Sequence, residues 1–272
     1  MRLSEINVYP VKSLKGISLS ESRVERRGLE FDRRWMLVDE KNEFLTQREL
    51  PKMATISTAL RENDLRCNDG KSEISVPFEI KSEETAKVRI WSKKCRAKVC
   101  GNHINEWFSD VLQAKCKLVQ MPGETYRKVN YFFAVRPDDH VSFADGYPFL
   151  LIGENSLADL NSRLEKKIPM NRFRPNFVVA GAEAIAEDSW KKIKISETVF
   201  HLVKPCARCV ITTIDQESGI SDGKEPLKTL AQYRIPKRSI KKKILFGQNL
   251  IAENAGQIVR VGDEIKVIES KN

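Results

Sequence analysis

Short runs of apolar and β-branched residues, separated by turn-forming residues, recur along the chain and constrain its fold more than any other feature. Several runs alternate between apolar and polar side chains, which is typical of half-buried β-strands. We predict strands at residues 5–11, 35–38, 44–46, 87–91, 177–180, 192–195, 199–203, 210–214, 257–261 and 264–268. The last two runs flank Gly262-Asp263 and predict a hairpin. Frequent short strands with few helices indicate a β-rich barrel.

Three stretches have helical periodicity instead, so the predicted fold class is β-rich α+β. The first begins at Asn102, a capping residue, and places apolar side chains on one face: Ile104, Trp107, Phe108 and Val111. A second is predicted after a cap at Asn155 or Ser156, and a third around Pro226. The breaker Met121-Pro122-Gly123 separates two parts, and we predict domains at residues 1–122 and 123–272.

Composition is that of an ordinary globular protein. The 272 residues are 41% hydrophobic and 31% charged, and no apolar run approaches the length of a membrane span. The N-terminus lacks the apolar core of a signal peptide, so we expect a cytoplasmic protein. The six cysteines are unevenly spaced, unlike the disulfide framework of a small secreted domain.

The formal net charge of +10 raises the question of nucleic-acid binding. The densest basic cluster, residues 236–243, has no interleaved aromatic residues and is better interpreted as a solvated loop. We therefore expect no nucleic-acid partner. The same charge suits a phosphorylated cofactor or an acidic electron-donor protein.

Residues 204–215 carry two thiols that flank a guanidinium, in the order Cys206-Ala207-Arg208-Cys209. A thioredoxin-type pair would open a helix, whereas β-branched residues at 210–214 favour a strand here. A zinc site would need a second ligand pair, and Cys95, Cys100 and His103 lie more than a hundred residues upstream. From the residues alone, the pair is either a cysteine presented to a metal centre or two half-buried thiols.

Seven segments in one order resemble a known family across nearly the whole chain: residues 9–16, 28–35, 145–150, 156–161, 173–176, 204–215 and 245–248. The chain resembles the two-part members of the MOSC superfamily, which include the amidoxime-reducing component and bacterial N-hydroxy-compound reductases. The resemblance implies a MOSC β-barrel preceded by a smaller β-rich N-terminal domain. It also implies a molybdenum cofactor between the two parts.

By position, the resemblance makes Cys209 the protein ligand to molybdenum. A thiolate suits a soft, sulfur-ligated metal, and the neighbouring Arg208 favours the deprotonated thiol. The resemblance places Asp145 beside the metal, where it would deliver protons if its pKa were raised. The remaining cofactor-binding candidates implied are Lys12, Ser13, Arg33, Gly146, Tyr147, Arg174, Asn176, Ala207, Arg208 and Gln248. Taken singly, Lys12 and these arginines would more often be surface cations.

The implied function is molybdenum-dependent reduction of N-hydroxylated small molecules. Alternatives are a carrier of the cofactor, a sulfur-carrier MOSC protein and, less in keeping with the motifs, an RNA-associated protein. At the level of the domain alone, the resemblance also implies pyridoxal phosphate binding. No dinucleotide fingerprint or P-loop is present, and no cysteine follows Cys209. We therefore expect electrons from a separate donor, such as a ferredoxin, flavoprotein or haem protein.

Overall fold

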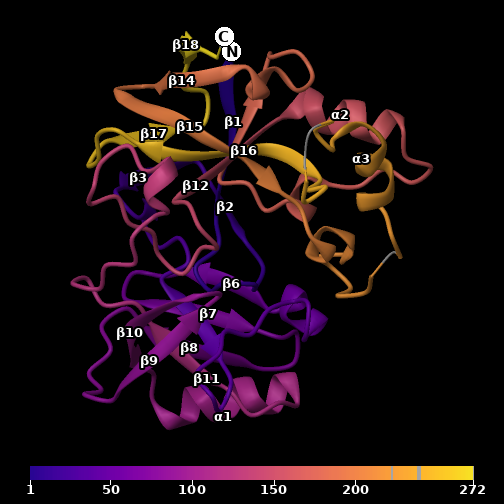
Figure 1. Ribbon diagram of the computed structural model, residues 1–272. Coiled ribbons are helices and arrows are strands. Elements are labelled where there is room, and N and C mark those ends of the chain that lie inside the picture. The colour runs from indigo at the N-terminus through magenta and orange to yellow at the C-terminus, as the bar shows by residue number, and fades with distance from the viewer. Residues whose placement is uncertain (222, 238–239, 272) are drawn as a thin grey trace.

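The computed structural model describes residues 1–221, 223–237 and 240–271 as two β-rich parts, one above the other in Figure 1. The upper part is built on an eight-stranded curled sheet with the order β18-β14-β15-β16-β12-β13-β1-β2. Its strands, in chain order, are β1 (Arg2–Val8), β2 (Ile17–Leu19), β12 (Phe149–Gly153), β13 (Phe177–Ala180), β14 (Trp190–Ile195), β15 (Thr198–Ala207), β16 (Leu245–Ala252) and β18 (Ile265–Ser270). The predicted β-rich α+β class is confirmed.

Alternation along these strands directs one face of the sheet into a continuous core. Phe149, Phe177 and Phe200 meet there at ring-centroid distances of 5.3–5.7 Å. Two helices, α2 (Glu154–Ser162) and α3 (Leu227–Tyr233), lie to one side, and the small sheet β17-β3-β4 covers another edge. Its strands are β3 (Glu21–Glu25), β4 (Gly28–Leu29) and β17 (Ile258–Arg260).

The lower part has its own core between two smaller sheets and one helix. The sheets have the orders β5-β11-β10-β9 and β6-β7-β8, and α1 (Asn102–Leu112) packs on β8 and β11. The strands are β5 (Trp35–Val38), β6 (Ser57–Leu60), β7 (Asp64–Asn68), β8 (Glu73–Pro77), β9 (Thr85–Ile90), β10 (Lys93–Val99) and β11 (Lys117–Gln120). Short 3-10 helices complete the chain: Pro51–Thr55, Tyr131–Phe133, Met170–Arg172, Ala186–Asp188 and Val210–Thr213.

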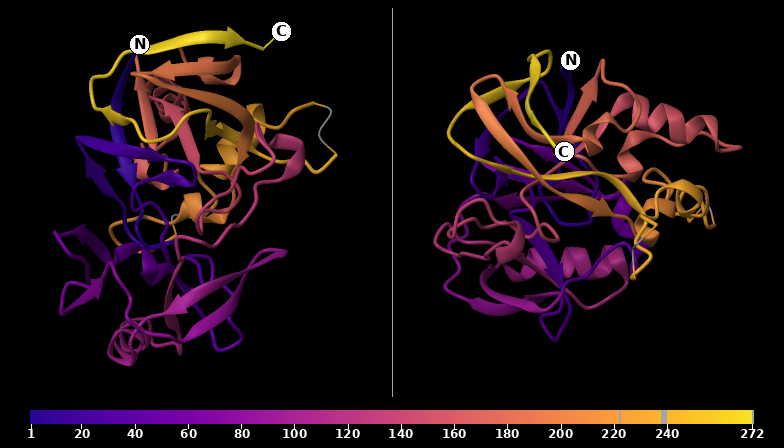
Figure 2. Two further views of the ribbon diagram at one scale, coloured as in Figure 1. Left: turned by 90° about the vertical axis from the view of Figure 1, so that its left-hand side faces the viewer. Right: turned by 45° about the horizontal axis from the view of Figure 1, so that its top comes forward.

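The two parts are interleaved in sequence. Strand β1 pairs with both β13 and β2, and β3 pairs with β17, so the first thirty or so residues join the upper part before the chain enters the lower one. Both termini consequently lie at the same end of the upper part (Figure 2). The predicted boundary between residues 122 and 123 stays a prediction. No helix in the described part of the chain is long and apolar enough to span a membrane.

Two strand predictions near functional segments are wrong. Residues 210–214 form the 3-10 helix Val210–Thr213 rather than a strand. The hydroxyls of Thr212 and Thr213 donate to the carbonyls of Cys209 and Val210 at 3.0 and 2.8 Å, so β-branched residues here stabilise a turn. Residues 44–46 form no strand, and Phe44 makes only an isolated bridge to Val38.

The predicted hairpin at residues 257–268 is also wrong, because β17 pairs with β3 and β18 pairs with β14. The turn residues bond to the first strand instead, Gly262 N donating to the Leu3 carbonyl and Leu3 N donating to the Asp263 carbonyl. Within the basic segment 236–243, residues 238–239 lie outside the described residues, so its solvated loop stays a prediction.

The predicted caps are displaced. Gly101 and Gly153, not Asn102, Asn155 or Ser156, are the N-caps of α1 and α2. A distant carboxylate, Glu187, accepts hydrogen bonds from Gly153 N and Ser156 Oγ, a cap that local sequence does not reveal.

Candidate functional site

A cavity lies where the two parts meet, and it gathers almost all the predicted site residues. It is lined by Lys12, Ser13, Arg33, Thr46, Arg48, Ala144, Asp145, Gly146, Tyr147, Phe149, Leu150, Arg172, Phe173, Arg174, Asn176, Cys206, Ala207, Arg208, Cys209, Ile211, Thr212 and Asn249. Gln248 is the exception. It is buried and donates to Asp188 Oδ1 at 2.6 Å, and its neighbour Asn249 lines the cavity instead.

Three lining residues adopt positive φ angles although none is glycine. Ser13 has φ 69°, Arg33 has φ 51° and Arg174 has φ 55°. Such conformations are uncommon for residues with a Cβ and concentrate at functional sites. The chain therefore tolerates local strain to direct these three side chains into one cavity.

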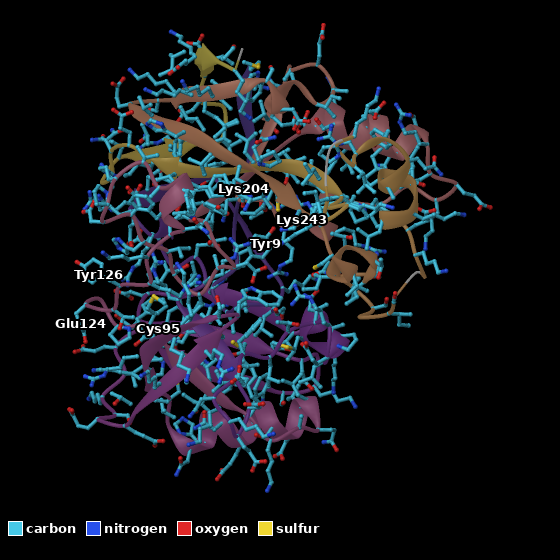
Figure 3. All side chains as sticks on the ribbon, viewed as in Figure 1. Tyr9, Cys95, Glu124, Tyr126, Lys204 and Lys243 are labelled. Carbon is cyan, nitrogen blue, oxygen red and sulfur yellow. The ribbon has the colours of Figure 1, made fainter. Side chains whose placement is uncertain are left out.

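Arg33 and Arg174 are held by a shared aromatic residue. Their guanidinium groups lie 4.4 and 4.2 Å from the centre of the Tyr9 ring, and Figure 3 shows Tyr9 at the junction of the two parts. Arg33 Nη1 also donates to Asp32 at 2.5 Å and to Asn176 Oδ1 at 3.1 Å. Burial lowers the pKa of Arg174 to about 10, well above neutrality, so its side chain presents a fixed positive charge.

Lys12 and Asp145 form an ion pair on the cavity wall, with Nζ 2.5 Å from Oδ1. Lys12 is buried, whereas the Asp145 side chain is 60% exposed to the cavity. Loss of hydration raises the pKa of Asp145. The charge and hydrogen bond of Lys12, followed by the charge of Arg48, lower the pKa by more than this, so that it lies well below the usual aspartate range. Asp145 is therefore an ionised carboxylate here.

Cys209 lies two residues beyond the end of β15, at the N-cap of the 3-10 helix Val210–Thr213. Arg48, which belongs to the lower part of the molecule, places its Nη2 3.3 Å from Cys209 Sγ. This contact places the positive charge of a guanidinium beside the sulfur. Cys206 lines the same cavity, but burial raises the pKa of its thiol.

Arg208 is fixed by backbone carbonyls. Its Nε and Nη1 donate to the carbonyls of Phe246 and Phe173 at 2.8 and 2.9 Å. Gly247 has φ 76°, and a Cβ there would lie 2.6 Å from Ile152 Cγ1 and 3.3 Å from Arg208 Nη2. Glycine is therefore required for the close packing that orients this guanidinium.

The loop that carries Asp145, Gly146 and Tyr147 is held from behind by one buried side chain. Arg127 Nη2 donates to the carbonyls of Ser142, at 2.8 Å, and of Ala144. These bonds fix the loop backbone against the cavity.

The lining charges are strongly unbalanced. Among the described residues, six cationic side chains but only one carboxylate, Asp145, face the cavity. Arg174 Nη2 and Arg208 Nη2 are buried and have no hydrogen-bond partner in the part of the chain that is described. Buried donors of this kind call for an acceptor. The residues present thus fit an anionic ligand with phosphate or ring oxygens.

The donor set does not fit a bare metal ion. No group of three or more histidine, cysteine, aspartate or glutamate side chains converges within the described ranges. A metal here would need to arrive with ligands of its own, leaving one position for Cys209.

Sequence reasoning missed several lining residues, of which Arg48 matters most. It follows the buried Thr46 and Gln47, outside every motif considered, and only the docking of the lower part on the upper part brings it to Cys209. Arg172 is similar: it is fully buried and donates to the Thr213 carbonyl at 2.9 Å.

Comparisons with known proteins identify two consecutive domains in the chain. Residues 1–115 match the MOSC N-terminal beta barrel domain, and residues 138–266 match the MOSC domain. The chain is 36% identical to mitochondrial amidoxime reducing component 2 of Rattus norvegicus, over 97% of this chain and 82% of that one. It is 32% identical to mitochondrial amidoxime-reducing component 1 of Homo sapiens, over 98% of this chain and 82% of that one. The comparisons give no support to pyridoxal phosphate binding.

Proposed function

Because the chain belongs to the family that joins a MOSC N-terminal beta barrel domain to a MOSC domain, we propose that it is a molybdenum-cofactor-dependent reductase of N-hydroxylated compounds. Its relatives are named for the reduction of amidoximes, which are N-hydroxylated amidines. The overall reaction adds two electrons and two protons to an N–OH group and yields N–H and water. The electrons come from a separate donor protein.

The observation that carries the proposal is the meeting of Cys209 with an anion-binding wall in one cavity. Arg33, Arg174 and Arg208 would hold the phosphate and pterin oxygens of the cofactor. Two of these guanidinium groups, those of Arg174 and Arg208, have a buried Nη2 without a hydrogen-bond acceptor among the described residues. Cys209 supplies the protein thiolate. When bound, the molybdenum cofactor supplies the redox centre that exchanges electrons and takes oxygen from nitrogen.

The Lys12–Asp145 pair handles protons. Since the pKa of Asp145 is strongly lowered, the carboxylate does not hold the proton of the pair, and Lys12 Nζ does. Burial lowers the pKa of Lys12, which makes its ammonium a better acid than an exposed lysine. Lys12 therefore delivers the proton, and Asp145 orients the Lys12 ammonium group. This differs from the sequence-based expectation, in which Asp145 itself delivers the proton.

The test compares the molybdenum and pterin content of the wild type with Cys209→Ala and with Cys206→Ala, its matched control in the same cavity. Wild type and Cys206→Ala should retain molybdenum and reduce benzamidoxime with a chemical reductant, whereas Cys209→Ala should lose both. Full molybdenum-dependent activity in Cys209→Ala would refute the assignment. Stable cofactor binding without N–O reduction would favour the carrier alternative.

A further inference from the structure

Trp91 contacts two residues that line the cavity, Asp145 and Arg48, and adopts a backbone conformation that is uncommon for residues with a Cβ. It is the first residue of the two-residue loop that joins β9 to β10, between the paired Ile90 and Lys93. Its φ is 55°, at a loop position where tight hairpins usually carry glycine or asparagine. It is also 50% exposed, unusual for so large an apolar side chain. Strain of this kind points to a function.

The indole contacts Asp145 directly and is linked to Cys209 through Arg48. Trp91 Nε1 donates to Asp145 Oδ1 at 3.3 Å. The Arg48 guanidinium lies 4.9 Å from the centre of the indole, and the same guanidinium reaches Cys209 Sγ at 3.3 Å. Phe44 packs edge-on against the indole at 5.0 Å. These contacts fix the orientation of the ring beside the cavity-lining residues Asp145 and Arg48, while half of its surface stays exposed.

We propose that Trp91 forms a stacking subsite for the planar, conjugated part of an N-hydroxylated substrate, and that it determines selectivity for such substrates over aliphatic hydroxylamines. This inference rests on the proposed function. A fixed aromatic face attracts flat π-systems, such as aryl amidoximes or N-hydroxylated nucleobases, irrespective of their hydrogen-bonding pattern. The N–OH group of a stacked substrate would point past Asp145 into the cavity. An aliphatic hydroxylamine has no flat π-system and therefore gains less from contact with the ring.

The first experiment measures kcat/KM for benzamidoxime and for N-cyclohexylhydroxylamine in the cofactor-loaded protein. The variants are Trp91→Gly, which removes the ring and relieves the positive φ, and Trp91→Phe, which keeps an aromatic face. Trp91→Gly should lower the benzamidoxime to N-cyclohexylhydroxylamine ratio about tenfold, and Trp91→Phe only about twofold, as expected for the loss and partial retention of stacking. An unchanged ratio in Trp91→Gly would overturn the inference. If the wild type still reduced both compounds, the proposed function would stand.

The second experiment needs no catalysis. Benzamidoxime added to cofactor-free protein should quench tryptophan fluorescence, because Trp35 and Trp190 are buried and Trp91 is half exposed. Trp107→Phe, on α1 in the lower part, is the matched control and should keep the quenching, whereas Trp91→Phe should lose it. Equal quenching in Trp91→Phe and the wild type would overturn the subsite even if every variant were active.

Discussion

Substitution of Gly247 by alanine should destabilise the protein and weaken its anion-binding wall. Alanine at φ 76° costs about 1–2 kcal/mol in backbone conformation. Its Cβ would also lie 2.6 Å from Ile152 Cγ1 and 2.8 Å from the Leu151 carbonyl, and overpacking of this kind costs a further ~1–3 kcal/mol. We therefore expect a loss of about 3 kcal/mol in the free energy of unfolding, measured by urea denaturation.

The control for Gly247→Ala is Gly70→Ala. Gly70 has φ 89°, and a Cβ added there would have nothing within 4 Å, so alanine meets only the conformational cost, about 1–2 kcal/mol. The difference between the two variants isolates the steric contact. Because that contact includes Arg208 Nη2, Gly247→Ala should also retain less molybdenum cofactor. Equal destabilisation by both variants, with cofactor retained in both, would refute the reasoning.

Two further predictions concern groups that join distant parts of the chain. Ionised Asp145 stabilises the fold above about pH 4, the ordinary aspartate range, because its pKa is lower in the folded than in the unfolded state, and this contribution is lost as the pH falls. In urea titrations at decreasing pH, the free energy of unfolding of Asp145→Asn should therefore fall less steeply than that of the wild type, and an identical slope would contradict the assignment. Gln47 and Gln216 are buried and exchange reciprocal amide hydrogen bonds of 3.1 Å between the two parts. Each single leucine substitution should lower the free energy of unfolding by about 2 kcal/mol, because it leaves the amide of the partner without its hydrogen bonds to the replaced side chain. The double variant should lose clearly less than the sum of the two single losses, whereas strictly additive losses would argue against the pairing.

The sequence predicted those elements whose signal is local. The runs at residues 35–38 and 177–180 coincide with β5 and β13, because an apolar run of only four residues is too short for a buried helix and favours a buried strand. The segment 210–214 misled because β-branched residues also suit a turn in which threonine hydroxyls bond to backbone carbonyls. The final hairpin failed because each of its strands has a better partner far away in sequence.

The motif resemblance predicted which residues come together in the cavity better than it predicted what each of them does there. Lys12, Arg174 and Cys209 lie far apart in sequence and share one cavity, as the resemblance implied. The protonation state of Asp145 was not predictable, because it depends on the 2.5 Å approach of Lys12. Arg48 was missed for the same reason: its significance arises from a contact across 161 residues.

The pairing of β1 with the distant strand β13 has a consequence for how the chain reaches its native state. Residues 2–8 are synthesised well before their partner β13, which begins at Phe177. At ribosomal rates of about 5–20 residues per second, the first strand waits roughly 10–30 s for that partner. During this interval its apolar face and unpaired edge are exposed, so a nascent chain of this architecture depends on protection until the second half emerges.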